Sequence, residues 1–269
     1  MTDFSWVLFL VLLIAGVIGT IAVIPYQFAL NPQILEKVTF SRTRLMALTL
    51  VQGTIMTAVV VGVGLLASRA VGLGAPVLET ILAGGDASAL VAEFVLPALL
   101  GGAIAYGLIV GLDRLVFMPR MPQPLRAAGK RAALWKRALA CLYGGITEEL
   151  MMRWFLMSVI VWAVGLVWQG ADGLPADGAY WVGILGAALL FGAGHLPATA
   201  NITRLTPWVI ARALLLNGIG GLIFGLLYWR FGLEAAMLAH FTTDVLLHVL
   251  TPIFAQRADA PTLTPAQSQ

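Results

Sequence analysis

The sequence predicts an all-α fold, a polytopic transmembrane helical bundle of about seven spans with one interfacial amphipathic helix. Of its 269 residues, 60% are hydrophobic and only 11% are charged, and the mean hydropathy is +0.93. A soluble domain carries about 25% charged residues, so this chain cannot cover a surface that faces water. Its solvent must largely be lipid, where a helical bundle satisfies the polar backbone groups within each span.

About 20 apolar residues are needed to cross the hydrocarbon core of a bilayer. The first such stretch is flanked by Asp3 and by no Lys or Arg, unlike a signal peptide, so we expect it to be a retained span. The fourth is too long for one straight span. Its basic lead-in, 125–137, contains Trp135 and predicts the interfacial amphipathic helix. The seven expected spans are 4–25, 45–67, 89–111, 138–168, 179–198, 207–229 and 233–254.

Charge between the apolar stretches predicts the orientation. Lys and Arg gather in 31–44 and in 118–137, and such segments are typical of cytoplasmic loops. The acids of 76–93 and 170–178 fit the opposite side. We therefore expect a protein of the bacterial cytoplasmic (inner) membrane, with its N-terminus outside and its tail in the cytoplasm. The net charge of +3 then reports topology, so the expected partner is the lipid bilayer and not nucleic acid.

Several ionisable residues interrupt the expected spans. Such residues are costly in lipid and indicate a functional site by default. By helix rise, those of the fourth and seventh spans lie roughly 13–15 Å deep, and that of the fifth lies nearer the cytoplasm. These depths are compatible with one site at mid-depth or open to the cytoplasm. The residues are Glu148, Glu149, Arg153, His195, His240 and Asp244.

The helical spacing of these residues indicates their chemistry. Glu149 and Arg153 are four apart and can pair, while Glu148 points about 100° away and is free for other work. Two histidines and a carboxylate from separate helices can hold a metal ion or a water molecule. A nearby glutamate can act as general base on that water. The set has what hydrolysis needs without an obvious Ser or Cys nucleophile.

Three short motifs occur in order: EELMMR at 148–153, FGAGH at 191–195 and HFTTD at 240–244. Together they resemble the EExxxR, FxxxH and HxxxN/D motifs of the CPBP family of intramembrane metalloproteases, which includes CAAX prenyl proteases and bacteriocin-processing and immunity proteins. The resemblance covers roughly 130–255. It implies a membrane-embedded endopeptidase that hydrolyses a peptide bond in a peptide or membrane-protein substrate.

The resemblance also implies roles for individual residues. Glu148 would be the general base, with His195, His240 and Asp244 as further catalytic residues, and Glu149 and Arg153 as supporting residues. His195 and His240 are candidate zinc ligands, and a metal-free mechanism with glutamate-activated water stays open. Asp244 would either orient His240 or ligate. The implied organisation is N-terminal transmembrane helices at 1–117, a basic cytoplasmic segment at 118–137, a catalytic helical core at 138–254 and a disordered tail at 255–269.

Two other functions fit the same residues. The chain could be a non-catalytic membrane scaffold or immunity protein of this family, with the cluster as a relic or a ligand pocket. An ion or metal transporter ranks lower, because transporters often show inverted repeats and the sequence shows none. Among the remaining intramembrane residues, we interpret Arg212 as snorkelling or pairing two helices, and His248 as structural.

Overall fold

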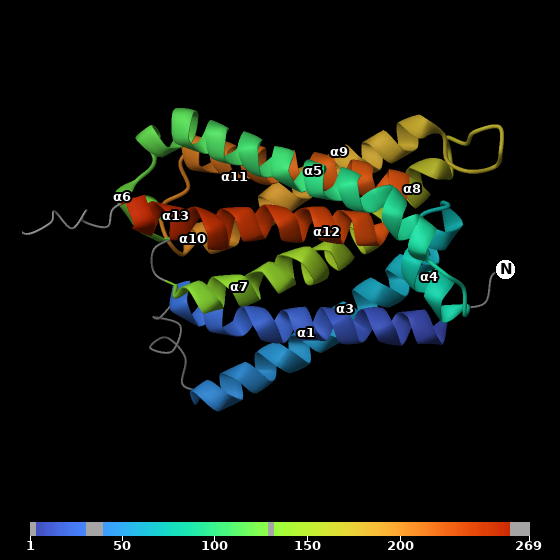
Figure 1. Ribbon diagram of the computed structural model, residues 1–269, viewed down its shortest axis with the longest axis horizontal. Helices are drawn as coiled ribbons and strands as arrows, with labels where there is room; N and C mark the ends of the chain where they lie inside the picture. The colour runs from blue at the N-terminus through green and yellow to red at the C-terminus, as the bar shows by residue number, and fades with distance from the viewer. Residues whose placement is uncertain (1–3, 31–39, 129–131, 259–269) are drawn as a thin grey trace, which may run out of the picture.

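A computed structural model describes residues 4–30, 40–128 and 132–258, and the prediction of an all-α bundle is confirmed (Figure 1). Within these residues the only extended pairing is an isolated bridge between Gln169 and Pro175. The longer helices are α1 (Trp6–Leu30), α3 (Arg42–Ala70), α5 (Ser88–Leu112), α9 (Asp177–Gly194), α11 (Pro207–Phe231) and α12 (Leu233–Asp244). The shorter ones are α4 (Pro76–Leu82), η2 (Met118–Arg120), α6 (Gln123–Ala128), α7 (Leu134–Leu142), α8 (Ser158–Gly165), α10 (Leu196–Ala200) and α13 (Thr251–Ala258). Four segments are π-helical: η1 (Asp113–Phe117), η3 (Tyr143–Glu148), η4 (Leu150–Met157) and η5 (Val245–Leu250).

Six helical stretches in the described residues are long and apolar enough to cross a membrane. They are Trp6–Leu30, Arg42–Ala70, Ser88–Arg120, Asp177–Ala200, Pro207–Phe231 and Leu233–Phe254. Each overlaps one of the expected spans. The seventh expected span, 138–168, is also helical, in the consecutive segments α7, η3, η4 and α8. It is less apolar than the others because it carries Glu148, Glu149 and Arg153.

The basic segment before this helix is less regular than expected. The predicted amphipathic helix, 125–137, is divided between the end of α6 and the start of α7, and residues 129–131 lie outside the described residues. At the other end of the chain, α13 runs to Ala258, so residues 255–258 of the expected tail are helical. Ala, Gln and Arg are good helix formers and continue the last span. Residues 259–269 lie outside the described part.

The helices lie side by side along the long axis of the molecule, with α3 inclined across α1 (Figure 1). The helix α12 lies between α5 and the helix that begins with α7. Buried apolar side chains of most long helices meet in one core, whose largest members include Trp154, Phe224 and Tyr228. The outward faces of the spans expose large apolar side chains, as expected of a protein surrounded by lipid.

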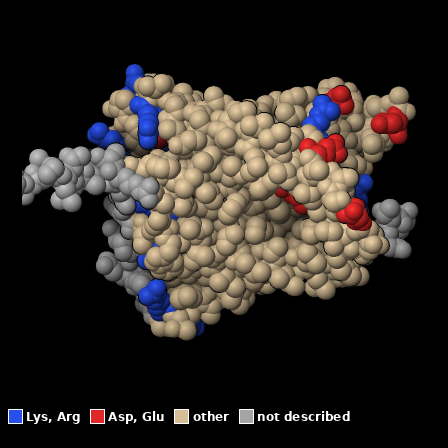
Figure 2. Space-filling model, viewed as in Figure 1, with Lys and Arg blue, Asp and Glu red and all other residues tan. Residues whose placement is uncertain are grey.

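Charged residues gather at the two ends of the bundle (Figure 2). Lys and Arg lie mostly at the end where Figure 1 places α6 and the start of α7, and Asp and Glu lie mostly at the opposite end. The wide middle band shows almost no charge. This distribution agrees with a molecule that spans a bilayer and keeps its basic loops on one side.

Small residues let α9 and α11 approach closely. A Cβ added at Gly221 would lie 2.6 Å from both Cα and Cβ of Ala188, whereas a Cβ at Gly218 would meet nothing within 4 Å. Contacts of this kind replace the hydrophobic driving force between helices in lipid. The same two helices carry residues of the candidate site, so this contact also sets the width of the site.

We therefore expect Gly221→Ala to lower the free energy of unfolding by about 1–3 kcal/mol, because two backbones must separate. Thermal unfolding of the purified protein in detergent would measure this loss. Gly218→Ala is the matched control and should be neutral or slightly stabilising, since alanine favours helix and meets no neighbour there. Equal melting temperatures for the two variants would contradict the close approach of α9 and α11.

Candidate active site

The first motif, EELMMR, lies on a helix with unusual geometry. The π-helical segment η3 ends at Glu148, and η4 begins at Leu150, so the two acids lie where one wide turn meets the next. Wide turns of this kind are rare and occur mostly at functional sites. Here they direct the two neighbouring carboxylates to different surroundings, one to a cavity and one to the protein core.

Glu149 is the acid that faces the core, where it has two partners. Its Oε1 accepts a hydrogen bond from Nη1 of Arg153 at 2.9 Å and one from Nδ1 of His240 at 2.6 Å. Arg153 in turn donates through Nη2 to the carbonyl oxygen of Gly221 at 3.1 Å. The side chains of Glu149 and Arg153 are 0% and 1% exposed. The predicted i,i+4 pair is present. Arg153 connects it with α11, and His240 connects it with α12.

This network determines which nitrogen of His240 faces the cavity. Because the carboxylate of Glu149 accepts, Nδ1 carries the proton of that hydrogen bond, and Nε2 points to the other side of the ring. There Nε2 lies 3.8 Å from Oε2 of Glu148 and 3.8 Å from Oδ1 of Asp244. These distances exceed a direct hydrogen bond and suit groups bridged by a small molecule such as water.

His195 lies at the C-terminal end of α9, on another side of the same cavity. Its Nδ1 is 2.8 Å from the carbonyl oxygen of Phe191, so Nδ1–H donates there and Nε2 is the remaining nitrogen. The ring of Phe191 contacts both imidazoles, at centroid distances of 4.8 Å to His195 and 5.9 Å to His240. Phe224 stacks on His240 at 4.7 Å. The two aromatic rings therefore hold His240 in place.

A cavity of about 870 Å³ brings the predicted catalytic residues together, since Glu148, His195, His240 and Asp244 all line it. They come from three segments that are distant in the sequence: the end of η3, the end of α9 and the helix α12. Gly144 is part of the wall, because a Cβ there would collide with Oδ2 of Asp244 and lie 3.2 Å from Nε2 of His240. Other lining residues at the basic end of the bundle are Leu30, Asp113, Arg114, Arg137, Asn201 and Thr251.

Two residues set aside in the sequence analysis also line this cavity. Arg212 donates through Nε and Nη2 to both carboxylate oxygens of Asp113, at 2.8 and 2.9 Å. It therefore pairs α11 with η1, which was one of its two expected roles. Nε2 of His248 lies 3.8 Å from Oδ1 of Asp244, and the side chain of His248 is 39% exposed. His240, Asp244 and His248 follow one another at intervals of four residues along the same helix.

The sequence reasoning missed Asp113, Gly144 and Phe224. Asp113 follows the expected third span by two residues, and an acid at that position is a signal that could have been used. Gly144 and Phe224 are apolar residues in apolar segments, and nothing in a single sequence distinguishes them from their neighbours.

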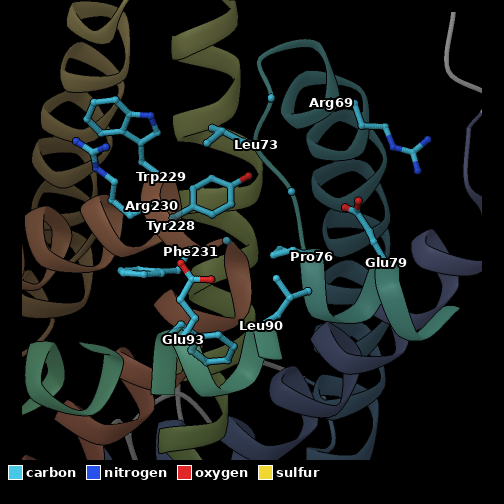
Figure 3. A pocket seen from close by; sticks show the side chains of 14 residues that line it. Arg69, Leu73, Pro76, Glu79, Leu90, Glu93, Tyr228, Trp229, Arg230 and Phe231 are labelled. Atoms are coloured by element: carbon cyan, nitrogen blue, oxygen red, sulfur yellow. The ribbon is translucent and has the colours of Figure 1, made fainter. Parts of the chain in front are cut away.

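A second cavity, of about 500 Å³, lies at the opposite, acidic end of the bundle (Figure 3). None of the described residues that line it is a histidine. Two of its charged groups already have structural contacts, since Oε1 of Glu79 accepts from the backbone N–H of Ala75 and the guanidinium of Arg230 lies 4.3 Å from the ring centroid of Trp229. Glu93 and Phe231 also line it (Figure 3). We therefore assign the candidate active site to the larger cavity.

The fit of a metal ion can be tested on the donor groups. The imidazoles of His195 and His240 are donors of a kind that zinc prefers. However, the described residues contain no group of three or more His, Cys, Asp or Glu side chains placed to hold a metal ion. The arrangement thus lacks the third protein ligand of a zinc centre, and zinc at this pair stays a prediction.

The fold and the cavity define an integral membrane protein whose helices enclose a cluster of carboxylates and histidines. A protein-family model, described as type II CAAX prenyl endopeptidase Rce1-like, matches residues 130–246. The matched segment contains all three motifs and every one of the predicted catalytic residues. The resemblance to the CPBP family of intramembrane proteases is therefore confirmed for this segment. The comparisons with curated proteins and with solved structures gave no match.

The buried network makes a prediction for Glu149→Gln. Removing this charge leaves the guanidinium of Arg153 buried without its counter-ion, which should cost about 3–5 kcal/mol of unfolding free energy. Asp113→Asn is the control, because its pair with Arg212 is partly exposed and should contribute about 1 kcal/mol or less. Thermal unfolding in detergent would compare them. A Glu149→Gln protein as stable as the control would contradict the network.

Proposed function

We propose that the protein is an intramembrane endopeptidase that hydrolyses a peptide bond with water activated by Glu148. The observation that carries this proposal is the meeting of Glu148, Asp244 and Nε2 of His240 at 3.8 Å separations inside a cavity within the bundle. The family match supports the same reaction class. The substrate would be a peptide or a segment of a membrane protein.

In this mechanism the carboxylate of Glu148 takes a proton from water, and the resulting hydroxide attacks the scissile carbonyl carbon. The same carboxyl group then delivers the proton to the amine that leaves. His240 and His195 would face the water and the carbonyl oxygen through their Nε2 atoms. Asp244, four residues after His240, would orient the ring and hold the attacking water.

The surroundings of Glu148 suit this role. Its side chain is 19% exposed, so it is accessible from the cavity but largely removed from bulk solvent. Charged and polar groups act more strongly in such a site than in water. Glu149 and Arg153 would contribute by fixing His240, and they would not touch the substrate.

We also propose an orientation. The cavity reaches the basic end of the bundle, where Arg114 and Arg137 line it. By the positive-inside rule this end would face the cytoplasm, and the N-terminus would lie outside, in a bacterial cytoplasmic membrane. A substrate would then reach the active site from the cytoplasmic side.

The proposal predicts that Glu148→Gln lowers the cleavage rate of a substrate of the wild-type protein by about 10²- to 10⁴-fold, because the amide cannot accept the proton of water. Peptide-cleavage assays in detergent or bicelles would measure the rate, with melting temperature as the check of folding. Glu93→Gln is the matched control, since Glu93 is exposed at the other end of the bundle. A folded Glu148→Gln protein that cleaves at the normal rate would refute the mechanism.

The zinc prediction has its own measurement. Zinc bound by Nε2 of His195 and His240 would supply a Lewis acid at the scissile carbonyl. If this pair holds zinc without a third protein ligand, elemental analysis of the purified protein will find about one zinc per chain, and His195→Ala and His240→Ala will lose it. Full activity in a preparation free of metal, with a chelator present, would favour the glutamate mechanism alone.

A further inference from the structure

The entrance of the catalytic cavity carries a charge that the proposed hydrolysis does not use. Arg137 lines the cavity at the start of α7, and the residues Ala140, Gly144 and Glu148 that follow on the same helix line it as well. Their spacing of three, four and four residues places all four on one helical face. A continuous stripe therefore connects the guanidinium at the entrance with the proposed general base.

Arg137 keeps much of its hydrogen-bonding capacity. Its Nε donates to the backbone oxygen of Ala132 at 2.9 Å, which fixes the direction of the side chain. Among the described residues, neither Arg137 nor Arg114 has a carboxylate within ion-pair distance. No described residue accepts a hydrogen bond from either Nη atom of Arg137, and a planar fork of this kind matches a carboxylate.

The local charge balance favours an anion at this place. Asp113 precedes Arg114 in the chain and also lines the cavity, but Arg212 neutralises it with two hydrogen bonds. Arg114 and Arg137 thus leave the entrance positive, and the basic end of the bundle adds to the potential (Figure 2). The inner part of the cavity, in contrast, holds Glu148 and Asp244.

We infer that Arg137, assisted by Arg114, binds a carboxylate of the peptide substrate and so selects where the chain is cut. This inference rests on the proposed endopeptidase function. Glu148 lies eleven positions after Arg137, or about 16 Å along the helix. An extended peptide advances about 3.3 Å per residue, so the carboxylate lies about four or five residues from the scissile bond. It belongs either to the C-terminus of the substrate or to an Asp or Glu side chain.

The test uses internally quenched peptides with one Leu- and Val-rich core, in bicelles of zwitterionic lipid. Five residues beyond the core, the peptide ends in a free carboxylate, in an amide, or in an amide preceded by Glu. For the wild-type protein we expect kcat/KM to be about tenfold higher for either carboxylate peptide than for the plain amide. Comparing kcat/KM of the peptide with a free C-terminal carboxylate and of the amidated peptide with Glu identifies which source of the carboxylate is preferred.

The variants connect this preference with Arg137. In Arg137→Gln the ratio of carboxylate to amide cleavage should fall towards one, and Arg137→Lys, which keeps the charge but not the fork, should give an intermediate ratio. Lys136→Gln is the matched control on the neighbouring residue, since Lys136 lies over the ring of Trp135 and does not line the cavity. It should leave the ratio unchanged. Melting temperatures check the fold of each variant.

Binding separates this inference from the proposed hydrolysis. Fluorescence anisotropy of the same peptides, labelled and mixed with the Glu148→Gln protein, needs no turnover. Tighter binding of the carboxylate peptides, lost in Glu148→Gln/Arg137→Gln, would support the site even if no peptide were cleaved, and the hydrolysis alone would then fail. Equal binding of acid and amide would overturn the inference. So would an Arg137→Gln protein that changes only the response to anionic lipid, because Arg137 would then bind headgroups.

Discussion

The arrangement of this site depends on one buried carboxylate, that of Glu149, which binds Arg153 and His240 at the same time. Two charged groups inside an apolar bundle are costly, and the cost is offset only where each has a counter-charge and hydrogen bonds. Glu149 supplies both, and Arg153 passes the connection on to the backbone of Gly221 on α11. Three helices are thereby fixed relative to one another at the depth of the cavity. Because Nδ1 of His240 is bound to Glu149, its Nε2 atom is the one that is directed at Glu148.

The backbone around the motif follows from the same requirement. Neighbouring acids on a regular helix diverge by about 100°, and one of them must reach the core while the other reaches the cavity. The π-helical segment η3 ends at Glu148 and η4 begins at Leu150, so Glu149 lies at the junction of two wide turns that alter the helical register beside both acids. Gly144, one turn earlier, lets the helix approach Asp244 without a side chain between them. The π-helical turns and Gly144 thus allow the backbone of this helix to lie close to Asp244, where a regular helix with larger residues would place side chains.

Much of this could be predicted from the sequence, because lipid restricts what a chain can do. Six spans follow from apolar length, and the segment expected as the seventh is helical up to Gly165 although it carries three charges. The i,i+4 pair of Glu149 and Arg153 follows from helical spacing. The contact between Glu149 and His240 could not be predicted, because it depends on how helices far apart in the sequence pack, and the π-helical turns leave no pattern in composition. The break between α6 and α7 was missed because the amphipathic pattern continues across it.

The chemistry of the site also explains why its polar groups have two distinct kinds of surroundings. Glu149 and Arg153 are buried with each other and do not line the cavity. Glu148, Asp244 and His195 face a cavity, and their free atoms are directed at whatever occupies it. Glu148 and Asp244 lie in its inner part, and Asp113 at the entrance is paired with Arg212. Among the described residues Arg114 and Arg137 have no carboxylate partner, so under the proposed function a bound peptide would meet opposite charges at its two ends. A symmetric cavity could hold an extended chain in either direction, whereas the charges proposed to bind the substrate would distinguish the two directions and so determine which bond lies beside Glu148.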